Sequence, residues 1–181
     1  MRRWGFLTIL PLLLLLLPGA VHPQEETEEL DRGFGNLELG LSLEETRQRL
    51  QGNSNFMYRG APDVSFRPFD QEESIETEGR GYMERGAFHF FEGELYIITL
   101  FLDRERIDYF TLYRTLLEKY GEPSELSPRR ASWETAETTV ILERPLTVKY
   151  IERERFEERI AEGRIEESIR TESRRNFLEQ F

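Results

Sequence analysis

The sequence contains no cysteine, and this absence removes several kinds of chemistry. A thiol nucleophile, a disulfide framework and a cysteine-based zinc site are all excluded. Only two histidines are present, His22 and His89, so a nucleophile–histidine pair or a histidine-rich metal site lacks its parts. A single histidine in a predicted strand is typical of a structural residue, and we assign His89 that role.

Positive charge is also scarce. The 181 residues include 24 Lys and Arg against 35 Asp and Glu, which gives a formal net charge of −11. Nucleic acid is bound by basic surfaces, so this balance argues against a nucleic-acid partner. The many glutamates are typical of a solvated surface and single out no catalytic pair, and a calcium loop would need closely spaced Asp or Asn with Gly. We therefore predict no catalytic residues, no metal site and no cofactor.

One long apolar run stands near the N-terminus. Two arginines precede a leucine-rich stretch over residues 6–17, which Pro18 and Gly19 close. This order is typical of a signal peptide, predicted over residues 1–23, and it places the protein in the bacterial periplasm or outside the cell. An uncleaved anchor is the alternative, although the run is short for the ~20 residues that a span requires. After cleavage we expect no membrane span.

The rest of the chain divides into three predicted parts. Residues 24–36 begin with a run of glutamates and end in glycines, and they predict a flexible tether. Residues 37–152 hold most of the remaining apolar side chains and predict a globular α+β domain. Residues 153–181 are dominated by Glu and Arg, and they predict a charged helix supported by ion pairs between residues four apart.

The densest apolar stretch of the domain, residues 87–102, predicts a β-hairpin. Glu92 and Gly93 are expected to form its two-residue turn, because glycine readily adopts a positive φ. Simple pairing around this turn, with side chains alternating between the faces, defines two apolar faces. One would hold Phe88, Phe90, Leu95, Ile97 and Phe101, and the other Ala87, His89, Phe91, Tyr96, Ile98 and Leu100.

Two helices are predicted beside this hairpin. Ser42 and Glu45 form a capping-box pattern before the first helix. The second is predicted over residues 109–120, where apolar residues recur every three or four positions and Gly121 follows. The aromatic side chains of the second helix are expected to pack on the hairpin as core rather than to form a ligand groove: Tyr109, Phe110, Tyr113 and Tyr120.

Further strands are predicted on both sides of the second helix. Residues 74–77 and 82–83 are expected in one strand leading to residue 87, and strands are predicted over residues 131–135, 138–143 and 146–151. The chain is therefore predicted to contain two units in tandem, each a helix followed by antiparallel strands. The predicted fold is α+β, a two-layer antiparallel sheet with helices on one face, plus the charged C-terminal helix.

Several short motifs carry a resemblance. They are Gly40-Leu41-Ser42, the EGEL hairpin at 92–95, LLEKYGEP at 116–123, and Trp133 with its paired strands. Over residues 34–150 the chain resembles small exported bacterial proteins of the BamE/SmpA-like and β-lactamase-inhibitor-like group. The resemblance implies a two-layer α+β module that binds other proteins, and it assigns no functional residue. The chain departs from the outer-membrane lipoproteins of that group because it has no lipidated cysteine and one helix before its strands where two are usual.

Two sets of apolar residues are candidates for binding a partner. Phe177, Leu178 and Phe181 end the charged helix, and they either fold back onto the domain or dock in a partner's groove. Tyr96 and Phe91 are expected on the second face of the hairpin, as an open aromatic surface. We predict an exported, non-catalytic cell-envelope module that binds a protein partner. The alternatives are a carboxylate-dependent hydrolase of an envelope polymer and an inhibitor-like module that binds through its open sheet face.

Overall fold

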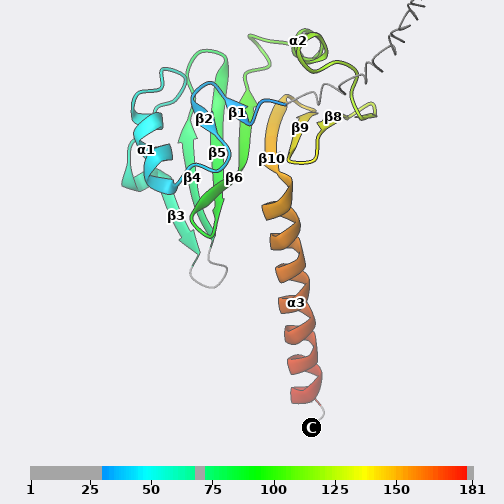
Figure 1. The fold of residues 1–181 in the computed structure, drawn as a ribbon. Helices are drawn as coiled ribbons and strands as arrows, with labels where there is room; N and C mark the ends of the chain where they lie inside the picture. Colours follow the sequence, from blue (N-terminus) through cyan, green and yellow to red (C-terminus); the bar gives the residue numbers. More distant parts are fainter. Residues whose placement is uncertain (1–29, 68–71, 179–181) are drawn as a thin grey trace, which may run out of the picture.

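The computed structural model describes residues 30–67 and 72–178 of the chain. Within these residues, eight antiparallel strands form one sheet in the order β3-β4-β5-β6-β10-β9-β8-β7, as Figure 1 shows in part. This confirms the predicted α+β class. The strands are β3 (Val64–Arg67), β4 (Glu72–Glu78), β5 (Met83–Phe91), β6 (Glu94–Leu102), β7 (Glu125–Leu126), β8 (Arg130–Glu134), β9 (Thr138–Glu143) and β10 (Thr147–Glu152).

The sheet consists of two similar units joined edge to edge. Helix α1 (Leu43–Gln51) precedes the meander β3–β6, with the short 3-10 turn η1 (Ala61–Asp63) between them, and helix α2 (Tyr109–Tyr120) precedes the meander β7–β10. The last strands of the two units, β6 and β10, pair antiparallel. In each unit the first strand therefore lies at an edge of the sheet and the last strand at its centre. This confirms the predicted tandem arrangement.

Each unit begins with a capped helix that buries one side. Ser42 accepts a hydrogen bond from the Glu45 backbone N–H, and the Glu45 side chain accepts one from the Ser42 backbone N–H, so the predicted capping box is present. Asp108 caps α2 in a similar way. Each helix buries residues four apart, which form a single apolar side. They are Thr46 and Leu50 in α1, and Leu116 and Tyr120 in α2.

The N-terminal segment belongs to the fold. Strands β1 (Gly33–Phe34) and β2 (Leu37–Glu38) form a small hairpin, and Leu30 is buried in the core. Gly33 has no room for a side chain, because a Cβ there would lie 1.9 Å from the Leu37 carbonyl oxygen. The predicted tether is therefore wrong for residues 30–36. Its remaining residues and the predicted signal peptide lie outside the described residues.

The central hairpin forms at the predicted turn but contains a β-bulge. Glu92 and Gly93 both have positive φ, 52° and 83°, and Phe90 pairs with Leu95. The next pair is His89 with Ile97, which leaves Tyr96 as the extra residue. One extra residue moves every following side chain to the opposite face of the sheet.

The bulge overturns part of the predicted face assignment. Ile98 and Leu100 join Phe88 in the core, whereas Ile97 and Phe101 turn to the opposite face. A second correction concerns the strand before the hairpin. β4 and β5 are separate antiparallel strands rather than the single strand predicted, since Gly79 and Gly81 lie at or beside the turn between them.

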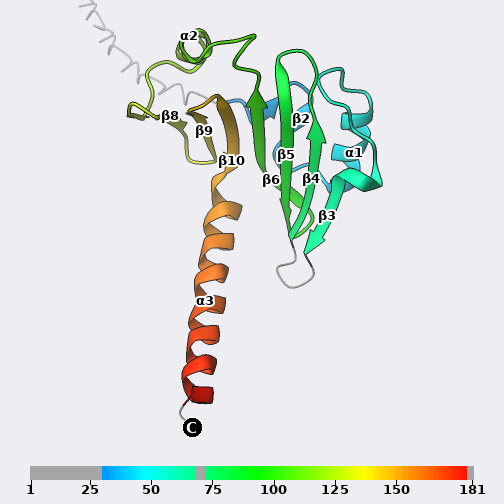
Figure 2. The same ribbon diagram turned by 180° about the vertical axis from the view of Figure 1, so that it is seen from behind.

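Helix α2 covers its own unit rather than the hairpin (Figures 1 and 2). The ring centres of Tyr113 and Tyr120 in α2 lie 6.3 and 6.1 Å from the ring centre of Trp133 in β8. The Trp133 indole is buried, and its Nε1–H donates to the Gly121 carbonyl at 2.9 Å. The expectation that α2 packs on residues 87–102 is therefore wrong. Its aromatic side instead covers β8, in its own unit.

Helix α3 (Arg153–Leu178) begins where β10 ends, as predicted, and projects away from the sheet (Figures 1 and 2). Arg153 donates to the Thr135 carbonyl at 2.9 Å, in the turn between β8 and β9. Arg155 pairs with Glu92 at 2.8 Å and with Glu94 at 2.9 Å, at the hairpin turn. The base of α3 is thus tied to one turn in each unit.

We expect Trp133→Phe to lower the free energy of unfolding by about 1–3 kcal/mol, because it removes the donor to the Gly121 carbonyl and leaves part of the buried indole's volume empty. Urea unfolding measures this change. Phe110→Leu, at an exposed position of α2, is the control and should shift stability by less than about 0.5 kcal/mol. Equal effects of the two substitutions would contradict the role of Trp133 as the anchor of α2.

Candidate interaction surface

An open groove of about 430 Å³ lies between α2 and the turn that follows β7. One wall comes from the first turns of α2, and the other comes from the end of β7, the turn after it and the loop before β10. The groove is mostly apolar. Its lining residues are Tyr109, Tyr113, Leu126, Ser127, Pro128 and Arg144.

Aromatic side chains form the α2 wall of this groove. Tyr113 packs on Trp133 and is therefore held in place by the core. Tyr109 is half-buried, and burial raises the pKa of its hydroxyl above the ordinary value. Phe110 follows in the next position and is 65% exposed. The aromatic stripe predicted as core is thus divided, with part of it in the core and part at the surface.

Arg144 supplies a positioned cation from the wall opposite α2. Its guanidinium carbon lies 4.2 Å from the centre of the Tyr109 ring, and its Nε–H donates to the Pro128 carbonyl at 3.1 Å. Its backbone N–H donates to the Arg129 carbonyl at 2.9 Å. These contacts hold the guanidinium against the aromatic ring while the Arg144 side chain stays exposed.

The groove adjoins the edge of the sheet. β7 is the outermost strand in its unit and pairs only with β8 within the described residues, through Glu125 with Ser132 and Leu126 with Ala131. The Leu126 side chain is exposed. An edge strand offers backbone N–H and C=O groups to another chain, and a nearby apolar groove can receive a side chain of that chain.

The predicted aromatic surface at Tyr96 and Phe91 is not an open one. Their side chains are 4% and 3% exposed, and their rings pack edge to face at 6.1 Å. The Tyr96 hydroxyl donates to the Glu72 carboxylate at 3.1 Å, which His89 also approaches at 4.0 Å. The expectation of an exposed docking surface here is wrong, because both side chains are buried. Partner binding by these two residues stays a prediction.

The predicted C-terminal residues lie far from the groove. Phe177 and Leu178 are 58% and 57% exposed near the end of the projecting helix, so the structure does not show them folded back onto the domain. Phe181 lies outside the described residues. The structure therefore brings the two predicted sets to different places, and it places neither of them beside Arg144.

Sequence reasoning missed the groove, although a signal was present. Tyr109 and Phe110 are adjacent, so their side chains leave the helix about 100° apart and cannot both face one core. Pro128 and Arg144 lie in loops, where no periodic pattern marks a surface. The groove depends on pairing between distant segments, which the sequence alone does not reveal.

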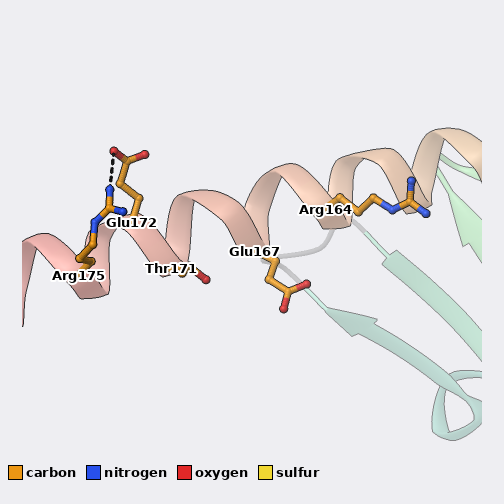
Figure 3. Close-up of a pocket in the computed structure, with 5 residues that line it drawn as sticks. All are labelled: Arg164, Glu167, Thr171, Glu172 and Arg175. Atoms are coloured by element: carbon orange, nitrogen blue, oxygen red, sulfur yellow. Dashed lines mark ion pairs between the residues drawn. The ribbon is translucent and has the colours of Figure 1, made fainter.

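A second hollow runs along α3 and is lined by that helix alone (Figure 3). Its side chains point in several directions, and Arg175 pairs with Glu172 at 3.6 Å. Because one helix cannot enclose a cavity, this hollow is a helix surface and not a ligand site. The lining residues are Arg164, Glu167, Thr171, Glu172 and Arg175.

Titratable groups of the described residues form ion pairs rather than a reactive cluster. The Asp63 carboxylate is buried, yet hydrogen bonds from the Arg59 backbone and guanidinium outweigh that burial and lower its pKa. Glu143 pairs with Lys149 at 2.6 Å. Across the described ranges, no three His, Asp or Glu residues are placed to hold a metal ion.

Comparison with known proteins identifies the fold family. The TP0088 domain matches residues 32–162, which is most of the chain. The chain belongs to the TP0088 domain family. The matched region contains both units of the sheet and the whole groove, and it ends inside α3. No curated protein and no solved structure matches the chain.

The part of this TP0088 domain protein that the structure describes contains no helix with the length and apolar character needed to cross a membrane. The predicted signal peptide lies outside that part.

Alkaline pH should destabilise the TP0088 domain through its buried tyrosines. Burial, followed by the nearby Glu72 carboxylate, raises the pKa of Tyr96 to about 12. A tyrosine whose pKa is higher in the folded state than in the unfolded state, where it is about 10, stabilises the fold below pH 10. That contribution is lost as the pH rises from about 10 to 12.

We therefore expect Tyr96→Phe to flatten the fall of unfolding free energy between pH 10 and 12, measured by urea unfolding at each pH. Tyr120, whose burial also raises its pKa to about 12, retains part of the slope. Tyr82→Phe, at an exposed tyrosine, is the matched control. The same slope in Tyr96→Phe and in the parent would contradict this role.

Proposed function

We propose that this chain is an exported, non-catalytic module of the bacterial cell envelope that binds a protein partner. The groove between α2 and β7 receives an extended segment of that partner, with an apolar side chain and a neighbouring carboxylate. The observation that carries the proposal is the meeting of half-buried aromatic side chains, a fixed arginine and a sheet edge in one place.

The apolar surface favours a macromolecular partner. Burying apolar surface contributes roughly 25 cal/mol per Å², so the exposed Phe110 and Leu126 gain free energy only when something covers them. The groove is open along its length, and an open groove suits a chain that passes across it better than an enclosed small molecule. The adjoining β7 edge supports the same choice, because an extended segment can add to it as a further strand.

The charge of the groove favours an acidic residue in the bound segment. The chain as a whole carries a formal net charge of −11, yet the exposed Arg129 and Arg144 stand together beside the groove. The guanidinium of Arg144 lies on Tyr109 and has Pro128 as a hydrogen-bond acceptor, so it can still donate to a carboxylate. In this proposal, the four glutamates within residues 24–29 of the chain itself compete with the acidic residue of the partner for the groove.

Export is supported by the basic and apolar order of residues 1–23. The carboxylate-dependent hydrolase stays an alternative prediction. The contacts of Asp63 and Glu143, each with a basic side chain, give it no support.

We expect the protein recovered from the periplasm or the medium to lack about the first 23 residues. Intact-mass measurement of the protein from each cell fraction tests this. A full-length chain in the membrane fraction would favour the uncleaved anchor, and an uncleaved chain in the cytoplasm would overturn the proposal of export.

A photo-reactive amino acid at Leu126, which lines the groove, should cross-link a partner protein in living cells, and the same residue at Tyr82 is the control because the two positions are similarly exposed, 62% and 65%. The partner, once identified and purified, should bind the parent protein. Leu126→Asp and Arg144→Glu should each weaken that binding at least about tenfold, because each removes an apolar contact or reverses the charge at the groove. Tyr82→Ala should leave it unchanged.

Two outcomes would overturn the proposal. One is an adduct at Tyr82 equal to that at Leu126, and the other is binding unaffected by both groove substitutions. If deleting residues 24–29 strengthens binding, the acidic segment competes for the groove. If the photo-reactive residue at 126 cross-links only to that segment, the groove serves the chain itself and the proposed partner site is wrong.

A further inference from the structure

Four connections between strands and helices meet at the end of the sheet opposite α3 (Figures 1 and 2). We call this surface the loop end, and its connections are residues 79–82, 103–108, 127–129 and 144–146. Backbone hydrogen bonds hold neighbouring connections together. They run from Asp103 to Tyr82 at 3.0 Å, from Leu102 to Leu146 at 3.0 Å and from Arg144 to Arg129 at 2.9 Å. The loop end therefore includes both units of the sheet.

The loop end differs from the rest of the domain in its basic side chains. Within residues 30–65 and 72–152, every Arg and Lys side chain away from this end is part of an ion pair. The basic side chains without an ion pair are Arg80, Arg104, Arg129 and Arg144 in the connections, and Arg130 in the first position of β8. The protein itself thus leaves the positive charge of this end uncompensated.

Charge is distributed unevenly between the two ends of the sheet. The four connections of the loop end contain five arginines and three acidic residues, although the chain as a whole has a formal net charge of −11. At the opposite end, residues 92–93 and 135–137 contain two glutamates and no basic residue. An anionic surface therefore repels most of the chain and attracts the loop end, and this difference orients the molecule.

The exposed large apolar side chains of the domain lie at the same end. Across residues 30–65 and 72–152 they are Met57, Tyr82, Phe110 and Leu126, between 37% and 65% exposed. The Met57 N–H donates to the carbonyl of Glu78, the last residue of β4, at 2.8 Å. Phe110 lies in the first turn of α2, and Leu126 ends β7. The unpaired arginines are therefore accompanied by apolar side chains that have nothing to cover them.

This combination of side chains suits the surface of an anionic membrane. Aromatic rings such as Tyr82 favour the interface between lipid and water. Arginines near the same interface are attracted to anionic headgroups, and their guanidinium groups can bind phosphate through two hydrogen bonds. A membrane can also contact connections from both units at once, because it is broader than the sheet.

The chain's own N-terminal sequence favours a lipid surface over an acidic protein. Its apolar run over residues 6–17 brings the chain to a membrane during the predicted export. The described chain begins at Leu30, and the next residue, Asp31, pairs with Lys119 of α2, the helix at the loop end. Residues 24–29 span at most about 20 Å. An uncleaved apolar run would thus keep the loop end close to the membrane.

We propose that the loop end docks on the surface of a membrane that contains anionic phospholipids. Tyr82 and Phe110 enter the lipid interface, the unpaired arginines bind headgroup phosphates, and α3 projects away from the membrane. The groove borders the loop end and shares Leu126 and Arg144 with it. These two residues are left unchanged in the tests below, and the proposal does not depend on the groove's partner.

Vesicle sedimentation tests the charge, using the protein as recovered from the periplasm or the medium. The vesicles contain phosphatidylcholine with or without phosphatidylglycerol, and the protein should bind only the mixed, anionic ones. Arg80→Glu combined with Arg104→Glu should weaken binding at least about twentyfold, because each arginine near an anionic surface strengthens binding roughly fivefold.

The matched control changes the net charge equally on the projecting helix. Arg164 and Arg174 are exposed in α3 and form no ion pair within the described residues. Arg164→Glu combined with Arg174→Glu should leave vesicle binding within about twofold, because salt screens charges over about 10 Å. Urea unfolding of both double variants checks that each remains folded.

An environment-sensitive dye tests the orientation, since the chain has no cysteine of its own. Labelled Tyr82→Cys should become brighter and shift to the blue with anionic vesicles, because position 82 enters the lipid interface. Labelled Ala136→Cys is the control, at an exposed position in the turn between β8 and β9, and should not change. The comparison also holds for an uncleaved chain, whose apolar run binds any vesicle without deciding which end faces the lipid.

Equal binding of the processed protein to both kinds of vesicle, or to neither, would overturn the proposal. Equal weakening by the two double variants would do the same, because it would show a general effect of net charge. A dye response at position 136 equal to that at position 82 would overturn the orientation. None of these results bears on the groove, whose partner can be titrated in solution without vesicles.

Discussion

The antiparallel pairing of β6 with β10 is the interaction on which the rest of the structure depends. It is the only long-range strand pairing between the two units within the described residues. Through it, Ile98 stands opposite Tyr150, and Tyr150 opposite Val140 in β9, so a continuous apolar row crosses both units. Small domains bury a smaller fraction of their surface and are only marginally stable, and joining the units gives them one shared core.

Local chemistry explains which parts of the fold were predictable from the sequence. The capping box at Ser42, the end of α2 at Gly121 and the turn at Glu92 all depend on neighbouring residues, and each prediction is confirmed. The bulge at Tyr96 is different. It places one extra residue where β6 leaves its pairing with Leu41 and begins its pairing with β10, and both partners are distant in sequence.

The same distinction applies to the candidate site. The spacing of α2 correctly predicted an apolar side, but the surface that receives it depends on β8, and Trp133 was not expected to be its partner. Phe110 therefore moved from the predicted core to the surface, while Tyr96 and Phe91 moved from a predicted surface into the interior. Apolar spacing shows that residues share a side, and the pairing of distant strands decides what covers it.

The attachment of α3 has a mechanical consequence. Its first turn is held by Arg153 to the turn at Thr135 and by Arg155 to the turn at Glu92, so the helix is braced by both units at once. A slight rotation of one unit against the other must tilt it. Over 26 residues, about 39 Å, a tilt of about 5° displaces the far end by roughly 3 Å. A small rotation between the two units is therefore converted into a larger displacement at the far end of α3.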